Sequence, residues 1–164
     1  ISRTKWPRLK ENLSLTLFLL LFITMVFPAV NAASHQETPS PAEVAAFKWL
    51  RENTPKEAKI LALLEEGHLV TYYGRRKNVM DDNFNLVSDI EERYAHLNSL
   101  FTTKFNALSV ELFEKYGITH IMFTERAKRR LSQSNFQYIT LGCYERLFDK
   151  QVKIYRIKHR AKAY

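Results

Sequence analysis

The chain has 164 residues, 46% of them hydrophobic, one cysteine and a formal net charge of +8. Residues 1–12 contain four basic and one acidic side chain, a net +3, and residues 153–164 contain five basic and no acidic side chains, a net +5. The interval 13–152 is therefore neutral, with sixteen basic and sixteen acidic side chains, and this distribution argues against nucleic acid as a partner. The single cysteine, Cys143, excludes an intrachain disulfide, and we expect it to act as a small buried hydrophobic residue.

Residues 13–30 form an apolar segment without a charged side chain, and the neighbouring basic residues all precede it. As a helix with ~1.5 Å rise per residue, it would be roughly 27 Å long, close to the ~30 Å hydrocarbon core of a bilayer. Since Lys and Arg favour the cytoplasmic side, we predict a basic cytoplasmic segment over residues 1–12 and a transmembrane helix over residues 13–30. The alternative is a cleaved signal peptide, because Pro28 interrupts the apolar run and Val30-Asn31-Ala32 resembles a processing site.

After this segment, small, polar and proline residues over 31–41 predict a linker. The first helix should begin at Pro41, because Ser40 and Glu43 have the spacing of a capping box. Gly74 and Gly117 are each expected to end a helix in the left-handed conformation. The other expected caps are Ser88, which also begins a capping box, and Thr103. The predicted helices cover residues 41–52, 69–73, 89–98, 104–116 and 126–130.

Strands are predicted from short apolar runs bounded by turn residues. The predicted strands cover residues 60–64, 78–81, 118–123, 136–141, 144–148 and 152–157. The last two are joined by Asp149-Lys150-Gln151, which predicts a hairpin. Helices and strands alternate earlier in the chain, so we predict an α/β domain over residues 42–158, with a mixed β-sheet, flanking helices and a C-terminal β-hairpin. A basic tail over residues 159–164 would follow it.

Two carboxylates and a histidine lie where the strand over 60–64 meets the next helix, a kind of sheet edge at which α/β proteins bind ligands. The alternative is that these glutamates only stabilise the positive end of the helix dipole. The predicted binding residues are Glu65, Glu66, Gly67, His68, Tyr72, Tyr73, Asp81 and Asp82. Since the spacing of acids, histidines and the cysteine fits no established catalytic or metal motif, we expect no catalytic residue, no metal site and no cofactor in this chain.

Three segments together resemble the extracytoplasmic C-terminal domain of archaeal polytopic glycosyltransferases and are similar to the catalytic subunit of oligosaccharyltransferase. They are residues 46–55, the strand ending in Glu65-Glu66-Gly67-His68, and residues 74–81. Residues 111–123 and the closing hairpin over 152–157 agree with this resemblance, which covers residues 42–158 and the preceding apolar span.

The resemblance implies that the chain is the last transmembrane helix and exterior domain of a lipid-linked-sugar-dependent glycosyltransferase at the cell membrane. Catalysis, and any divalent metal, would belong to upstream loops of the rest of that polytopic protein, because the family's catalytic arginine and metal-binding acids lie there. Residues 63–67 occupy the place of the family's Trp-Trp-Asp-Tyr-Gly motif, which recognises the acceptor, and keep only its glycine and, as glutamate, its acid.

The partners that the resemblance implies are membrane lipid, the rest of the polytopic protein, and an acceptor peptide or glycan. If Ile1 is an internal cut, the chain is the tail of that longer membrane protein. The alternative function is a single-span membrane-anchored, or secreted, interaction domain without enzymatic activity.

Overall fold

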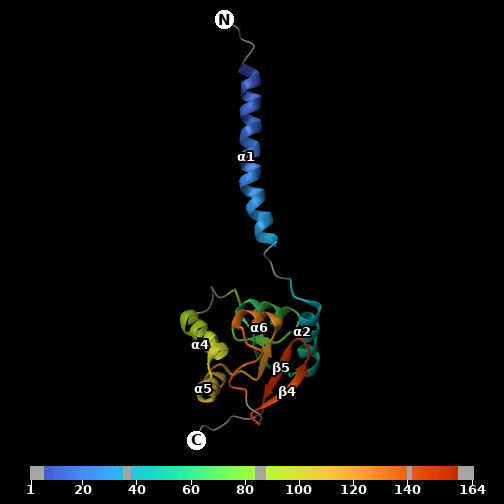
Figure 1. The fold of residues 1–164 in the computed structure, drawn as a ribbon, viewed down its shortest axis with the longest axis vertical. Coiled ribbons are helices and arrows are strands. Elements are labelled where there is room, and N and C mark those ends of the chain that lie inside the picture. The colour runs from blue at the N-terminus through green and yellow to red at the C-terminus, as the bar shows by residue number, and fades with distance from the viewer. Residues whose placement is uncertain (1–5, 35–37, 84–87, 140–141, 159–164) are drawn as a thin grey trace. The chain divides into compact units, whose positions relative to one another are not determined.

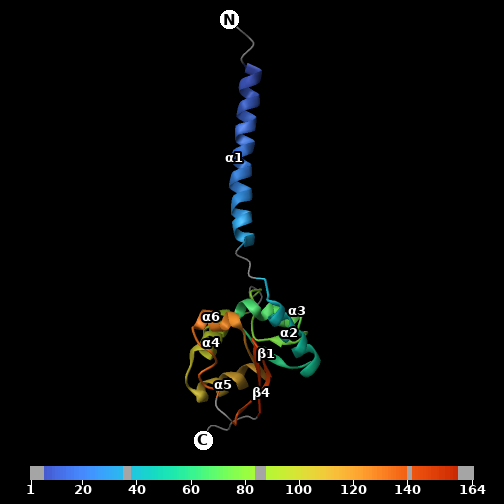
Figure 2. The ribbon, with the colours of Figure 1, turned by 45° about the vertical axis from the view of Figure 1, so that its right-hand side comes forward.

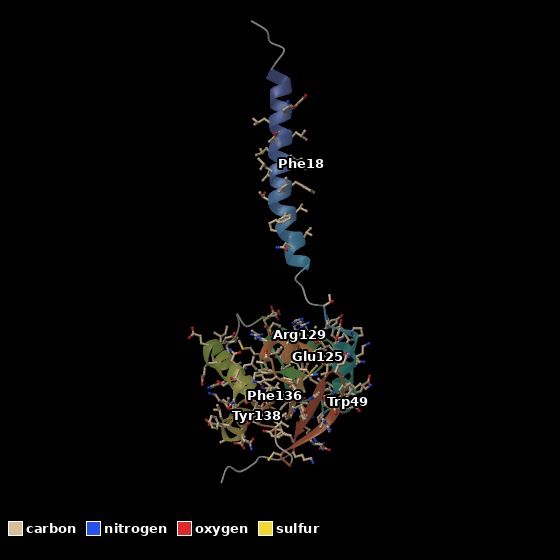
Figure 3. The ribbon with its side chains drawn as sticks, viewed as in Figure 1. Phe18, Trp49, Glu125, Arg129, Phe136 and Tyr138 are labelled. Carbon is tan, nitrogen blue, oxygen red and sulfur yellow. The ribbon has the colours of Figure 1, made fainter. Side chains whose placement is uncertain are left out.

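The computed structural model describes residues 6–34, 38–83, 88–139 and 142–158. It divides into two compact units, Ile1–Pro39 and Ser40–Tyr164, which are described separately. The first contains helix α1 (Trp6–Ser34), which continues through Pro28 and whose described apolar side chains, such as that of Phe18, are exposed (Figure 3). By length and composition, residues Glu11–Asn31 of α1 can cross a membrane, and they are the one such segment in the described part of the chain.

The second unit is built on a five-stranded mixed sheet with the strand order β2-β1-β3-β5-β4 (Figure 1). The strands are β1 (Lys59–Leu61), β2 (Lys77–Asn78), β3 (His120–Phe123), β4 (Tyr144–Asp149) and β5 (Lys153–Ile157). β1 runs parallel to β2 and β3, whereas β5 is antiparallel to both β3 and β4. The predicted α/β class, with a mixed sheet and a closing hairpin at one edge, is therefore confirmed.

Helices cover both faces of this sheet (Figure 2). The helical elements are α2 (Pro41–Asn53), the 3-10 turn η1 (Leu64–Glu66), α3 (Gly67–Tyr72), α4 (Ile90–Thr102), α5 (Asn106–Tyr116) and α6 (Glu125–Leu131). α2 and α3 pack on one face, and α4, α5 and α6 pack on the other.

The two innermost parallel strands send alternate side chains into two hydrophobic cores. Ile60 and Met122 pack with α2 and α3, while Leu61 and Ile121 pack with α4, α5 and α6. Successive side chains of a strand point to opposite faces of its sheet, so uninterrupted apolar runs suit strands that are covered on both sides.

Two predicted helix ends are confirmed. The hydroxyl of Ser40 accepts a hydrogen bond from the N–H of Glu43, whose carboxylate accepts one from the N–H of Ser40, completing the capping box. Gly117 ends α5 in the left-handed conformation, with φ of 64°.

The prediction for Gly74 is wrong, because the left-handed residue after α3 is Arg75, with φ of 50°. A different constraint requires glycine at position 74. A Cβ there would lie 2.6 Å from the carbonyl oxygen of Val70. Glycine is therefore required here because a neighbouring backbone carbonyl leaves no room for a side chain, and not because the residue has a left-handed backbone angle.

The caps predicted for the next two helices are also wrong. α4 begins at Ile90 with Asp89, not Ser88, at the N-cap, and no side-chain cap bond forms there. α5 begins one residue after Phe105, and the hydroxyl of Thr103 accepts a hydrogen bond from the N–H of Phe105 outside the helix. The apolar faces of both helices are buried in one core, and such burial is worth more than the roughly 1 kcal/mol of a cap.

The strand predicted over residues 136–141 is not formed by residues 136–139, and residues 140–141 lie outside the described part. This irregular segment instead places two aromatic rings in the core (Figure 3). The Phe136 ring centroid lies 4.8 Å from that of Phe123 and 5.4 Å from that of Tyr138. Alternating apolar residues therefore fill a core here without pairing to a strand.

Candidate functional site

The carboxyl ends of β1, β2 and β3 meet at one edge of the sheet, because these strands are parallel neighbours. β1 leads into η1 and α3, β2 leads to Asp81 and Asp82, and β3 leads into α6. Helices α3 and α6 lie next to each other at this edge (Figure 2). We call this region the carboxyl-end corner and define it as residues 63–68 with Asp81, Asp82 and Thr124.

Glu66 lies in the interior of the corner, with 1% of its surface exposed. Its Oε1 accepts a hydrogen bond of 2.6 Å from the hydroxyl of Thr124, and its Oε2 accepts one of 3.3 Å from the N–H of Leu63. Burial raises the pKa of the carboxyl from 4.5 to about 7, although these hydrogen bonds and the charge of Arg126 act in the opposite direction. The carboxyl of Glu66 therefore joins two strand ends from within.

Gly67 begins α3 at a point where the backbone of the next loop passes close by. A Cβ at this position would lie 2.3 Å from the carbonyl oxygen of Met80 and 2.7 Å from the Cβ of Asp81. The segment after β2 thus packs directly against the start of α3. Only glycine allows this approach, so Gly67 shapes the corner through its backbone.

Glu65 is exposed and forms an ion pair with Arg130 of α6. The pair connects η1 to α6 on the outside of the corner, while Glu66 and Thr124 connect the same two elements inside it. Because both partners are solvent-exposed, this ion pair contributes little to stability, at most ~1 kcal/mol. A charged ligand could compete for either side chain at small cost.

His68 and Asp82 meet at the surface, where His68 Nδ1 lies 3.6 Å from Asp82 Oδ1. Behind them, the amide of Asn78 donates hydrogen bonds to the carbonyl of Gly67 at 2.8 Å and to Asp81 Oδ2 at 3.1 Å. The other oxygen of Asp81 accepts a bond from the N–H of Asn83. Asp81 is therefore engaged in shaping the loop, while Asp82 faces solvent.

Tyr72 is the last residue of α3 and Tyr73 follows it, and the two differ in exposure. Tyr72 is 67% exposed, whereas Tyr73 is half-buried against the core formed with α2. Their rings meet edge to face, with centroids 4.8 Å apart and planes at 87°. The contact lets the partly buried ring fix the orientation of the exposed one.

Of the eight predicted binding residues, the structure gathers Glu65, Glu66, Gly67, His68, Asp81 and Asp82 at the corner, and Tyr72 and Tyr73 follow along α3. Sequence reasoning missed Thr124, the N-cap of α6, which completes the corner, and Arg130 of α6, which pairs with it from outside. The position of Thr124 directly after an apolar strand and before a helix was an available signal, because Thr is a common N-cap and here accepts from the N–H of Ala127.

The corner offers carboxylates and an imidazole, and the neighbouring Asn78 and Tyr72 add an amide and an exposed aromatic ring. These groups suit recognition by hydrogen bonding and stacking. In the residues that the structure describes, no group of three or more His, Cys, Asp or Glu side chains is placed to hold a metal ion. A cavity of about 30 Å³ lies beside the corner between α4 and α6, lined by residues that include Leu64 and Arg130. It is large enough for little more than one water molecule.

Comparison with known proteins gives a likeness in fold. No protein-family model matches the chain. Autophagy-related protein 23 from Kluyveromyces lactis is 23% identical over 148 residues, which cover 79% of this chain and 34% of that protein. The chain thus spans about a third of the length of this curated relative.

Two solved structures from Archaeoglobus fulgidus are similar. Archaeal oligosaccharyltransferase AglB, in complex with an inhibitory peptide and a dolichol-phosphate, matches 66% of this chain and 16% of its own, with 15% identity and a TM-score of 0.44. The C-terminal globular domain of oligosaccharyltransferase matches along its whole length and over 74% of this chain, with 14% identity and a TM-score of 0.53. The fold resemblance predicted from the sequence is therefore confirmed: the second unit has the fold of an oligosaccharyltransferase C-terminal domain.

Proposed function

We propose that this chain is the non-catalytic, extracytoplasmic end of a polytopic, lipid-linked-sugar-dependent glycosyltransferase in the cell membrane. In this proposal α1 is the last membrane span, and the second unit binds acceptor peptide or glycan beside an active site that the rest of the protein supplies. The observation that supports it most is the fold match over the entire C-terminal domain of an oligosaccharyltransferase. The apolar helix that precedes the domain has the length that a membrane span requires.

The corner supports a binding role rather than a catalytic one. Its inner carboxyl, Glu66, is shielded from solvent by the protein and occupied by two hydrogen bonds. Its outer groups make exposed contacts that a ligand can replace, namely the ion pair of Glu65 with Arg130 and the polar contact of His68 with Asp82. A rigid inner layer with exchangeable outer groups is the arrangement expected of a preorganised binding edge.

Binding by the full chain in lipid nanodiscs tests this proposal. The probes are a fluorescent peptide containing Asn-Ala-Thr, the glycosylation acceptor pattern, and a panel of chitopentaose, mannopentaose and cellopentaose. We expect at least one probe to bind, and the triple variant Glu65→Gln, His68→Ala, Asp82→Asn to weaken that binding at least ~10-fold, or ~1.4 kcal/mol.

The matched control changes exposed acids on other helices, Glu91→Gln on α4 and Glu111→Gln on α5, and should leave binding unchanged. Failure of every probe to bind the wild-type chain would contradict the proposal and favour the alternative of a membrane-anchored interaction domain. Equal weakening by both variants would also contradict it, because the effect would then be one of overall charge.

A further inference from the structure

We propose that α3 and the turn after β2 form a carbohydrate-binding face, with the ring of Tyr72 as its stacking surface. This inference rests on the proposed function and narrows it, since it names a glycan rather than a peptide as the ligand of this part of the molecule. The face consists of His68, Thr71, Tyr72, Asn78 and Asp82.

Tyr72 has the exposure and the support that a stacking surface requires. Two thirds of the residue is open to solvent, yet its ring is held edge to face by Tyr73. Tyr73 in turn packs against the core that contains Phe47 and Val70. A sugar ring presents polarised C–H groups on one face, which are attracted to the negative face of an aromatic ring. Because Tyr72 is oriented before a ligand arrives, little conformational entropy is lost on stacking.

Hydrogen-bonding groups lie on the same side of α3. His68 precedes Tyr72 by four positions, and residues four apart in a helix share a face, which places the imidazole beside the ring. The hydroxyl of Thr71 borders this side through its contact with the amide of Asn78. The carboxylate of Asp82 faces His68, and within the described residues His68 is its one polar partner. Its other oxygen makes no hydrogen bond to a residue that the structure describes, and it can accept hydrogen bonds from sugar hydroxyls, which commonly occur in adjacent pairs.

The side chains of Asn78 and Asp81 connect the two segments that carry these hydrogen-bonding groups. The amide nitrogen of Asn78 lies 3.1 Å from the hydroxyl of Thr71 and 2.8 Å from the carbonyl of Gly67. The same amide reaches Asp81, whose other oxygen accepts from the N–H of Asn83 beside Asp82. The segment that contains Asp82 and the helix that contains Tyr72 are thus joined by a single amide side chain.

The surroundings favour a glycan over a peptide. Peptides bind either by adding a strand to a sheet edge or by placing side chains in apolar pockets. The nearby edge strand β2 has only two residues, Lys77 and Asn78, which is too short for an added strand. The cavity beside the corner, about 30 Å³, is too small for a large peptide side chain and lies on the α4 side of the sheet. A neutral, hydroxyl-rich ligand fits the exposed ring and carboxylate without needing a pocket.

Saturation-transfer NMR on the full chain in nanodiscs tests the inference, with the same three pentasaccharides as probes. We expect the wild-type chain to bind at least one of them, Tyr72→Ala to weaken this binding at least ~10-fold, and Tyr72→Phe to retain it, because the ring face is preserved. Asp82→Asn should weaken it as well. Tyr94→Ala removes another exposed tyrosine, on α4, and is the matched control that should bind as the wild type does.

Folding of each variant is checked by the fluorescence of Trp49 in a Trp6→Phe background, since the chain has two tryptophans. If Tyr72→Ala binds the sugars normally, or if the wild type binds only the Asn-Ala-Thr peptide, the inference is overturned while the proposed function stands. If the wild type binds neither sugar nor peptide, both are overturned.

Discussion

The hydroxyl of Thr124 donates a hydrogen bond of 2.6 Å to Oε1 of Glu66, and both residues are buried. The bond joins the segments that follow β1 and β3, which are 58 positions apart in the chain. The same hydroxyl accepts from the N–H of Ala127 at the start of α6. One side chain therefore caps a helix and satisfies a buried carboxyl, and the corner depends on it.

Replacing Thr124 by Val should destabilise the second unit by about 2–4 kcal/mol. The change removes the cap of α6 and leaves the buried Glu66 carboxyl without one of its two hydrogen bonds, while it preserves the shape of the side chain. Thr124→Ser keeps the hydroxyl and should cost about 1 kcal/mol or less. Urea unfolding, monitored by the fluorescence of Trp49, measures the free energy of unfolding of both variants. Similar losses for Val and Ser would contradict the assignment to the hydroxyl.

The pH dependence of stability should change when Glu66 is replaced by Gln. Burial raises the pKa of Glu66 in the folded state to about 7, from an ordinary value of 4.5. The folded state thus binds a proton at Glu66 more tightly than the unfolded state does. The contribution of Glu66 to the free energy of unfolding therefore falls as pH rises from about 4.5 to about 7, by at most ~3 kcal/mol.

A second buried group acts in the opposite sense over part of this window. Desolvation lowers the pKa of His120 on β3 to about 4, below its ordinary value of 6.5, so its contribution to stability rises with pH between these two values. The measurement is therefore the difference between the wild type and Glu66→Gln from pH 4.5 to 7.5. That difference should change steadily across the window, and a constant offset would show that Glu66 does not titrate there.

Gly67→Ala should destabilise the second unit by roughly 2 kcal/mol or more, because the new methyl group would overlap the carbonyl oxygen of Met80. His68→Ala, at the next position, is exposed and should change the unfolding free energy by no more than ~0.5 kcal/mol. Thermal melts of the two variants in the same nanodiscs compare them directly. Equal melting temperatures would mean that the loop after β2 can move away from α3 without cost.

Protease added to intact cells that express the chain should degrade the second unit. The basic residues before the apolar segment predict that Ser40–Tyr164 lies outside the cytoplasm if α1 is retained in the membrane. Immunoblots for tags at the two ends distinguish the sides, and permeabilised cells provide the control. Protection of the C-terminal tag in intact cells would show the opposite orientation. Recovery of that tag in the medium would support a cleaved signal peptide instead.

The fold could be predicted because its signals are local. Ser40 and Glu43 are three residues apart, Gly117 ends a helix by its own backbone angle, and the closing hairpin is made by neighbouring runs. The wrong predictions share one cause. That cause is close packing, which the pattern of residue types does not show. Gly74 is required by the nearby carbonyl of Val70, and the segment 136–139 places its rings against core residues such as Phe123.

The candidate site could be predicted only in part, for the same physical reason. The meeting of Glu65 to His68 with Asp82 follows from parallel strands that end at one edge. The partners that α6 supplies depend on β3 lying beside β1, and no local pattern encodes that neighbour. Arg130, for example, is 65 positions from Glu65.

The place of β5 between β3 and β4 has a consequence for synthesis of the protein. The four buried residues of β3 pair with residues 153–156, which follow them in the chain only after α6 and β4. A ribosome must therefore have synthesised β5 before β3 gains its second neighbour, and a chain that stops before Lys153 leaves the backbone of β3 open to another strand. Such truncated products should require chaperones or be degraded.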